Sequence, residues 1–187
     1  EESVTTPADL NMQKYPDGSG RTVDEVIKEL AGSSIKENLA VTGLARYQTS
    51  TGMVGSYVHH NGKVGALVEA DGANNDAVKV LLGEVAMHIA AGVPQVPIAT
   101  DRSGVPRDII EREREAASHG LEGKPEQIKE KIITGKVDKA LSEIVLTEQP
   151  FVKDEKLKIK DLVAQAGKAA GGTVTLKRFA RLKVGEA

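Results

Sequence analysis

Apolar residues recur every three or four positions in several stretches of this chain, and this period predicts amphipathic helices. The clearest helix begins after Asn74 or Asn75, either of which can cap its first turn, and it stops at Gly92. Its apolar stripe comprises Val78, Leu81, Leu82, Val85 and Ile89. The same period predicts shorter helices over residues 22–32 and 157–172.

A second pattern, in which apolar and polar residues alternate, predicts strands. Two β-rich runs, SYVHH and KVGALVE, lie within residues 55–69. They are joined by the sequence HNG, and Asn-Gly is typical of a tight hairpin turn. Further strands are predicted over residues 39–47 and 173–184, whereas the first 21 residues show neither period and are predicted to form a loop.

Two strongly charged helices are predicted between these elements. Pro106 suits the first turn of one helix, which runs to Ser118, and residues 126–146 form the other. The sequence HGLEGKP breaks the chain between them, so we expect an antiparallel, coiled-coil-like hairpin at about residues 105–146. Each helix has a narrow apolar seam, formed by Ile109, the stem of Glu113 and Ala116 in one and by Ile128, Ile132, Val137, Ala140, Leu141 and Ile144 in the other.

Two helix-then-strand blocks of the chain resemble each other. TVDEVIKEL followed by LAVTGLARY has nearly the same spacing as KIKDLVAQA followed by VTLKRFARL, which is consistent either with an internal repeat or with a common structural unit used twice. The second block follows a predicted hairpin that can pair with its strand. The first block has no such hairpin before it, so we expect either that the strand at residues 39–47 has other partners or that the chain is truncated.

The composition excludes several kinds of function. The 187 residues carry a formal net charge of -2. They include no cysteine, and this absence excludes disulfides, thiol catalysis and thiolate zinc sites. Aromatic residues make up 3% of the chain, too few to favour a base-stacking platform. No apolar run is long enough to cross a bilayer and the start lacks the features of a signal peptide, so we expect a cytoplasmic protein, or one of an organellar matrix if the source is eukaryotic.

Familiar catalytic and ligand-binding motifs are also missing. No Gly-Lys pair is followed by Ser or Thr, as a phosphate-binding loop requires, and the four histidines lack metal-ligand spacing, so no cofactor or metal is expected. His88 is predicted to lie on a helix face with a satisfied nitrogen rather than to act as a base. The cluster Lys177, Arg178, Arg181 and Lys183 is predicted to be the polar face of a strand, and RNA binding is the alternative interpretation.

Several blocks, taken in order, resemble the elongation factor Ts family. They are IKEN, GSYVHHNGKVGALVE, VAMHIAA, the charged hairpin, LTEQPFVKD and RFARLKVGE, and together they extend from about residue 22 to the end of the chain. The resemblance implies an α+β fold in which a small antiparallel three-stranded sheet packs with helices and the helical hairpin projects. It further implies that residues 1–54 are a linker and the last helix and strand of a first core subdomain, and that residues 55–187 are the second.

The family acts without covalent chemistry, so the resemblance implies that this protein is not an enzyme. It implies instead a guanine nucleotide exchange factor that binds elongation factor Tu and promotes GDP release by stabilising the nucleotide-free form. Ile35, Lys36 and His59 match the family's partner-contact positions, although the family usually has Gly where this chain has Lys36.

Two further expectations follow from the resemblance. The family's Thr-Asp-Phe-Val segment, which inserts near the magnesium site of the GTPase, does not occur in this sequence, so weak binding and poor exchange are predicted. The alternative function is a dimerisation or docking module, in which the helical hairpin and the sheet edges mediate self-association into a homodimer.

Overall fold

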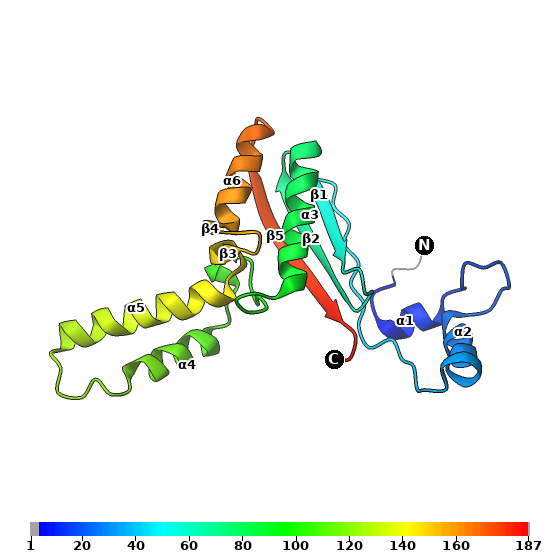
Figure 1. Ribbon diagram of the computed structural model, residues 1–187, viewed down its shortest axis with the longest axis horizontal. Helices are drawn as coiled ribbons and strands as arrows, with labels where there is room; N and C mark the ends of the chain where they lie inside the picture. Colours follow the sequence, from blue (N-terminus) through cyan, green and yellow to red (C-terminus); the bar gives the residue numbers. More distant parts are fainter. Residues whose placement is uncertain (1–3, 187) are drawn as a thin grey trace. The chain divides into compact units, whose positions relative to one another are not determined.

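The computed structural model describes residues 4–186 and has an α+β fold (Figure 1). The chain divides into two compact units, one comprising Gln48–Arg181 and the other comprising the residues up to Tyr47 together with those from Leu182 onward. Within the part of the chain that is described, no helix combines the length and the apolar character that a membrane crossing requires.

The larger unit is built on a three-stranded sheet. Its strands are β1 (Gly52–Val58), β2 (Val64–Gly72) and β5 (Val174–Lys183), in the order β1-β2-β5. β1 and β2 form the predicted antiparallel hairpin. The backbone of Ala73 bonds to Thr173, whereas Glu69 pairs with Arg178, so β5 runs antiparallel to β2. The prediction of a small antiparallel three-stranded sheet is confirmed.

Helix α3 (Asp76–Ala91) lies on this sheet and forms the centre of the core (Figure 1). The Asn75 side chain accepts hydrogen bonds from the first-turn amides, and Gly92 ends the helix in the left-handed region with φ 64°. Helix α6 (Ile159–Ala169) also packs against α3. The buried stripe of α3 matches the predicted one, comprising Val78, Leu81, Leu82, Val85 and Ile89 together with Ala86, His88 and Ala90.

The charged helices α4 (Arg107–Ser118) and α5 (Glu126–Ile144) form the predicted antiparallel hairpin, which Figure 1 shows extending away from the sheet. Arg114 of α4 pairs with Glu130 of α5 at 2.7 Å. The predicted seams are wrong in two places: Ala117 rather than Ala116 is buried, and Ile128 is 48% exposed. The rest of the predicted seam holds, since Leu141 is buried and Ile109, Val137 and Ile144 pack around it. The two errors arise because the many Glu and Arg residues obscure the exact phase of so narrow a stripe.

A second, two-stranded sheet connects the hairpin to α6. The sequence predicts an extended turn at residues 149–152, but the structure has strand β3 (Pro150–Phe151) paired with β4 (Asp154–Lys158). β4 occupies the start of the predicted helix, so α6 begins only at Ile159. Both strands are too short for alternation to reveal them.

Two predictions for the smaller unit are wrong. The first 21 residues contain helix α1 (Pro7–Met12), whose N-terminus is fixed by a capping box between Thr6 and Asp9. Residues 39–47 form no strand, although their pattern alternates. A strand requires hydrogen-bonded neighbours, which a pattern in one segment cannot supply. Helix α2 (Val23–Leu30) is confirmed, with Thr22 as its cap.

A buried polar network joins α3 to the base of the hairpin. His88 and Gln149 are both fully buried, and His88 Nε2 lies 2.9 Å from Gln149 Oε1. The Val152 amide donates to His88 Nδ1 at 3.3 Å, so Nδ1 is unprotonated and Nε2 carries the proton that it donates to Gln149. The prediction that His88 is a helix-face residue with a satisfied nitrogen is confirmed.

The network makes stability depend on pH. Burial lowers the pKa of His88 from its ordinary value of 6.5, and the hydrogen bond to Gln149 offsets this only in part. As the pH falls, the unfolded chain therefore binds a proton at this histidine at a higher pH than the folded chain does. We expect full stability above pH 6.5 and a decline below it that ends at the folded-state pKa.

Thermal unfolding followed by circular dichroism over a pH series measures this effect. The decline below pH 6.5 should become smaller in His88→Gln and persist in His119→Gln, because residue 119 is exposed. Equal slopes in the wild type and His88→Gln would contradict the assignment.

Candidate partner-binding site

The three candidate residues lie in different units. Ile35 and Lys36 are adjacent in the smaller unit, and His59 lies in the larger one. The structure thus brings Ile35 and Lys36 together, while His59 lies in the hairpin between β1 and β2. Lys36 directly follows a helical turn, and His59 directly follows strand β1.

Ile35 and Lys36 sit where helix α2 ends. The helix continues through one π-helical turn, Ala31–Ile35, in which the Ser33 hydroxyl donates to the Glu29 carbonyl at 2.7 Å. Lys36 then reverses the chain direction with φ 58°, a left-handed conformation that favours glycine. Ile35 is 47% exposed as a result, which leaves an apolar side chain available to a partner.

A shallow hollow adjoins this turn. It has a volume of about 400 Å³ and is lined by Ala31, Gly32, Lys36, Glu37 and Asn38. The small residues leave room beside the backbone, while Lys36 and Glu37 place opposite charges at its margin. The hollow is therefore open and lined by exposed polar and small residues around the turn.

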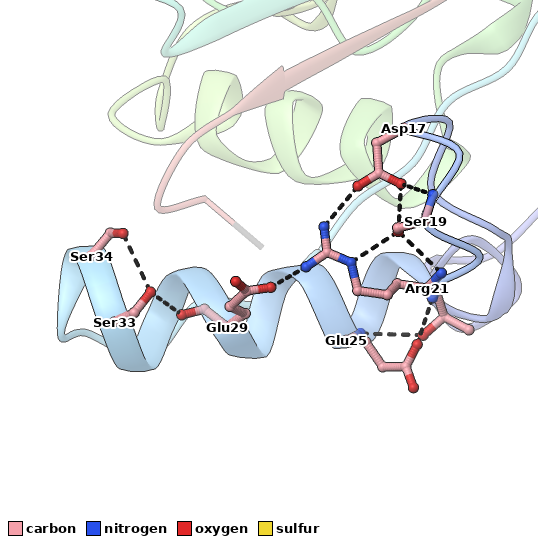
Figure 2. Close-up of polar contacts among 8 residues, drawn as sticks. Asp17, Ser19, Arg21, Glu25, Glu29, Ser33 and Ser34 are labelled. Carbon is pink, nitrogen blue, oxygen red and sulfur yellow. Dashed lines mark hydrogen bonds and ion pairs between the residues drawn. The ribbon is translucent and has the colours of Figure 1, made fainter.

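An ionic network fixes the loop that leads into α2 (Figure 2). Arg21 pairs with Asp17 at 2.7 Å and also reaches Glu29 on the helix. Hydrogen bonds from the Ser19 hydroxyl and amide, together with that from Arg21, lower the pKa of Asp17 to about 2. Thr22 and Glu25 add a capping box at the first turn. These contacts hold the PDGSG loop against the helix that carries Ile35.

His59 closes the β1–β2 hairpin. Its amide donates to the Val64 carbonyl and its own carbonyl accepts from the Gly62 amide, each at 2.8 Å. The Tyr57 hydroxyl lies 3.2 Å from His59 Nδ1, and the ring of His60 lies tilted beside that of His59 at a centroid distance of 4.2 Å. Because Tyr57 packs against the main core, the imidazole of His59 is supported from the protein side and half-buried.

The charged and titratable side chains around these positions are arranged as follows. Within residues 4–186 no three His, Asp or Glu side chains gather as metal ligands would. The basic cluster on β5 is largely engaged: Arg178 pairs with Glu69 at 2.7 Å, Lys177 with Asp71 at 3.4 Å, and Lys183 with Glu186 at 2.5 Å. Residue pattern alone missed the supporting roles of Arg21 and Tyr57; only the Asp-x-Ser turn in PDGSG gave a local signal.

The strained backbone at Lys36 leads to a prediction. Lys36→Gly should stabilise the turn by about 1 kcal/mol, because glycine adopts φ 58° without the Cβ penalty. Slower amide hydrogen exchange across residues 31–38 would register the gain. Ser34→Gly, in the helical part of the same turn, should accelerate exchange instead; a similar response of both variants would argue against strain at Lys36.

Comparison with known proteins now defines the family. A family model described as "Elongation factor TS" matches residues 1–186. The elongation factors Ts of Nostoc sp. and Erythrobacter litoralis are 35% and 41% identical to this chain, each over 95% of it and 58% of the relative. That of Aquifex aeolicus is 39% identical over 95% of this chain and 59% of its own length. The chain thus spans a little under three-fifths of these relatives, and it belongs to the elongation factor Ts family.

Proposed function

We propose that this chain docks on elongation factor Tu and promotes release of its GDP. The observation that carries the proposal is the β1–β2 tip, where His59 is held between the hairpin hydrogen bonds and the Tyr57 hydroxyl in a member of this family. A half-buried, supported imidazole loses little conformational entropy on binding. This is a favourable property for a contact residue.

The proposed activity needs binding energy but no covalent step. If the chain binds nucleotide-free elongation factor Tu more tightly than the GDP complex, thermodynamic linkage requires that it weaken GDP binding by the same factor. Typical coupling free energies are about 1–3 kcal/mol. Differential binding of this kind accounts for GDP release without any catalytic side chain in the docking chain.

The smaller unit would supply a second contact. Ile35 offers an exposed apolar side chain at the end of a fixed helix, beside the hollow lined by Gly32. Lys36 replaces the glycine usual in the family and brings a long charged side chain to that place. We therefore propose that Ile35 contributes affinity by apolar contact and that the Lys36 side chain hinders close approach of the partner backbone.

Stopped-flow release of a fluorescent GDP analogue from elongation factor Tu tests the proposal, alongside an equilibrium measurement of binding. We expect measurable binding and a modest acceleration of release, since the sequence has no Thr-Asp-Phe-Val segment. A rate equal to that produced by a full-length elongation factor Ts would contradict the weak-exchange proposal. Absence of binding to both the nucleotide-free and the GDP-bound forms would overturn the function itself.

His59→Ala should weaken binding to elongation factor Tu about tenfold, because a contact residue near the centre of an interface contributes on the order of 1–2 kcal/mol. Calorimetric titration provides the dissociation constants. His119→Ala is the matched control, since residue 119 is an exposed histidine that follows α4 in another part of the larger unit. Loss of affinity in His119→Ala but not in His59→Ala would contradict the assignment and would indicate that the partner contacts the helical hairpin instead.

A further inference from the structure

The β1–β2 turn contains a reactive pair that partner binding does not explain. The chain has five asparagines, and Asn61 is the one followed by glycine; Met12, Leu39, Asn75 and Asp76 follow the others. Asn61 and Gly62 are both exposed, and Gly62 has φ 68°. A glycine at the next position leaves its backbone nitrogen unhindered by a side chain, so the asparagine carbonyl is open to attack from it.

We propose that Asn61 is a site of spontaneous deamidation in the folded protein. The Lys63 amide donates to Asn61 Oδ1 at 2.9 Å, which folds the side chain back over the peptide bond to Gly62. The same hydrogen bond polarises the side-chain carbonyl and stabilises negative charge that develops on Oδ1, as donors in an oxyanion hole do. The donor is a backbone group held in place by the hairpin.

The reaction balances with water as the co-reactant. The Gly62 backbone nitrogen attacks Asn61 Cγ, the new C–N bond closes a succinimide ring, and the side-chain nitrogen leaves as ammonia with the proton of the Gly62 amide. Water then adds to either ring carbonyl and breaks one C–N bond. The products are aspartate, with the normal backbone, and isoaspartate, in which the backbone passes through the side-chain carbon.

The other asparagines differ from Asn61: Leu39 follows Asn38 and hinders the attacking nitrogen with its side chain, and the remaining three are held by local structure. Asn75 caps α3 by accepting from the Ala77 and Val78 amides, and Asn74 donates to the Gly52 carbonyl. Asn11 lies within α1, where the following amide is part of a helix. One contact opposes reaction at Asn61: the Gly62 amide donates to the His59 carbonyl at 2.8 Å, so the turn must open before the nitrogen attacks. Opening an exposed turn is a local fluctuation that leaves the sheet intact.

The product would change the proposed docking tip. Deamidation places a carboxylate between His60 and Lys63, two residues from His59. This consequence, unlike the reaction, rests on the proposed function. An added surface charge at an interface edge changes affinity by about twofold to fivefold. The folded chain would therefore lose affinity for elongation factor Tu as it ages.

Peptide mapping by mass spectrometry tests the reaction on the intact folded chain, incubated at mildly alkaline pH. We expect the mass gain of amide-to-acid conversion in the peptide that contains Asn61, with isoaspartate exceeding aspartate, and little gain in peptides containing Asn38 or Asn74. The two Asp-Gly pairs, at Asp17 and Asp71, can isomerise without a mass gain, so mass separates them from Asn61. Equal gain at all asparagines, or gain only in urea, would overturn the proposal.

Two variants separate the reaction from its consequence. Asn61→Gln should abolish the mass gain, because a glutamine closes a larger ring far more slowly. Asn61→Asp mimics one product and should bind elongation factor Tu about twofold to fivefold more weakly than Asn61→Gln. If mapping finds the modification but the two variants bind equally, the modification site stands and its effect on docking fails. If neither variant binds, the proposed function fails, whereas the mapping result is unaffected.

Discussion

Gly55→Ala is expected to destabilise the larger unit by about 1–3 kcal/mol, because the added methyl group would overpack the contact between β1 and α3. A Cβ at Gly55 would lie 2.4 Å from Leu82 Cβ and 2.9 Å from the Leu82 carbonyl carbon. Leu82 is fully buried on the central helix, so it cannot move aside without separating the helix from the sheet. Urea unfolding followed by circular dichroism measures the change in free energy of unfolding.

Gly83→Ala is the matched control for this prediction. Gly83 neighbours Leu82 on α3, yet a Cβ there would meet no atom within 4 Å. The same substitution should therefore stabilise the protein by about 0.5–1 kcal/mol, the usual gain from replacing glycine inside a helix. Both variants add one methyl group, but only the one at Gly55 meets buried atoms. Equal stability of the two would mean that α3 does not rest on β1 at this position.

The elements that sequence predicted correctly carry long, self-consistent patterns. α3 has a full apolar stripe with an asparagine cap and a glycine stop, and the β1–β2 hairpin combines alternation with a turn sequence. Two of the elements it missed depend on other parts of the chain. β3 and β4 are defined by their pairing with each other. α1 has 6 residues, too few for an apolar period to be recognised, and its start is fixed by a capping box instead.

The candidate site was only partly accessible to sequence reasoning. Ile35, Lys36 and His59 came from resemblance to a family, not from a pattern that predicts contact. What the structure adds is their support: the left-handed backbone of Lys36, the π-helical turn before it and the Tyr57 hydroxyl beside His59. Each depends on geometry several residues away. A residue-by-residue pattern contains no information of that kind.

The role of Gln149 also depends on distant parts of the chain, because its side chain bonds to groups from three other segments. The Gln149 amide nitrogen donates to the Gln95 carbonyl at 2.9 Å and to the Glu143 carbonyl at 2.6 Å, while its oxygen accepts from His88. One buried side chain thus joins the loop after α3, the end of α5 and the core helix. The prediction of an extended turn at this glutamine gave no indication of the role.

Gln149→Leu is expected to destabilise the protein by about 3 kcal/mol or more. Leucine has similar size but leaves the His88 Nε2–H and two backbone carbonyls without their partner, and each buried unsatisfied group costs about 1–3 kcal/mol. Urea unfolding provides the free energy. Gln95→Leu is the control, because the Gln95 side chain is exposed and its hydrogen bond to the Glu143 carboxylate lies at the surface, so its effect should stay within about 0.5 kcal/mol.

The wild-type protein offers a second measurement should Gln149→Leu fail to fold. Nitrogen-15 NMR of the imidazole ring should find His88 neutral at pH 7 with its proton on Nε2, because the Val152 amide donates to Nδ1. A proton on Nδ1 would require that amide to point elsewhere and would break the link between α3 and β3. The tautomer therefore decides whether the hairpin is tied to the core through this network, independently of any variant.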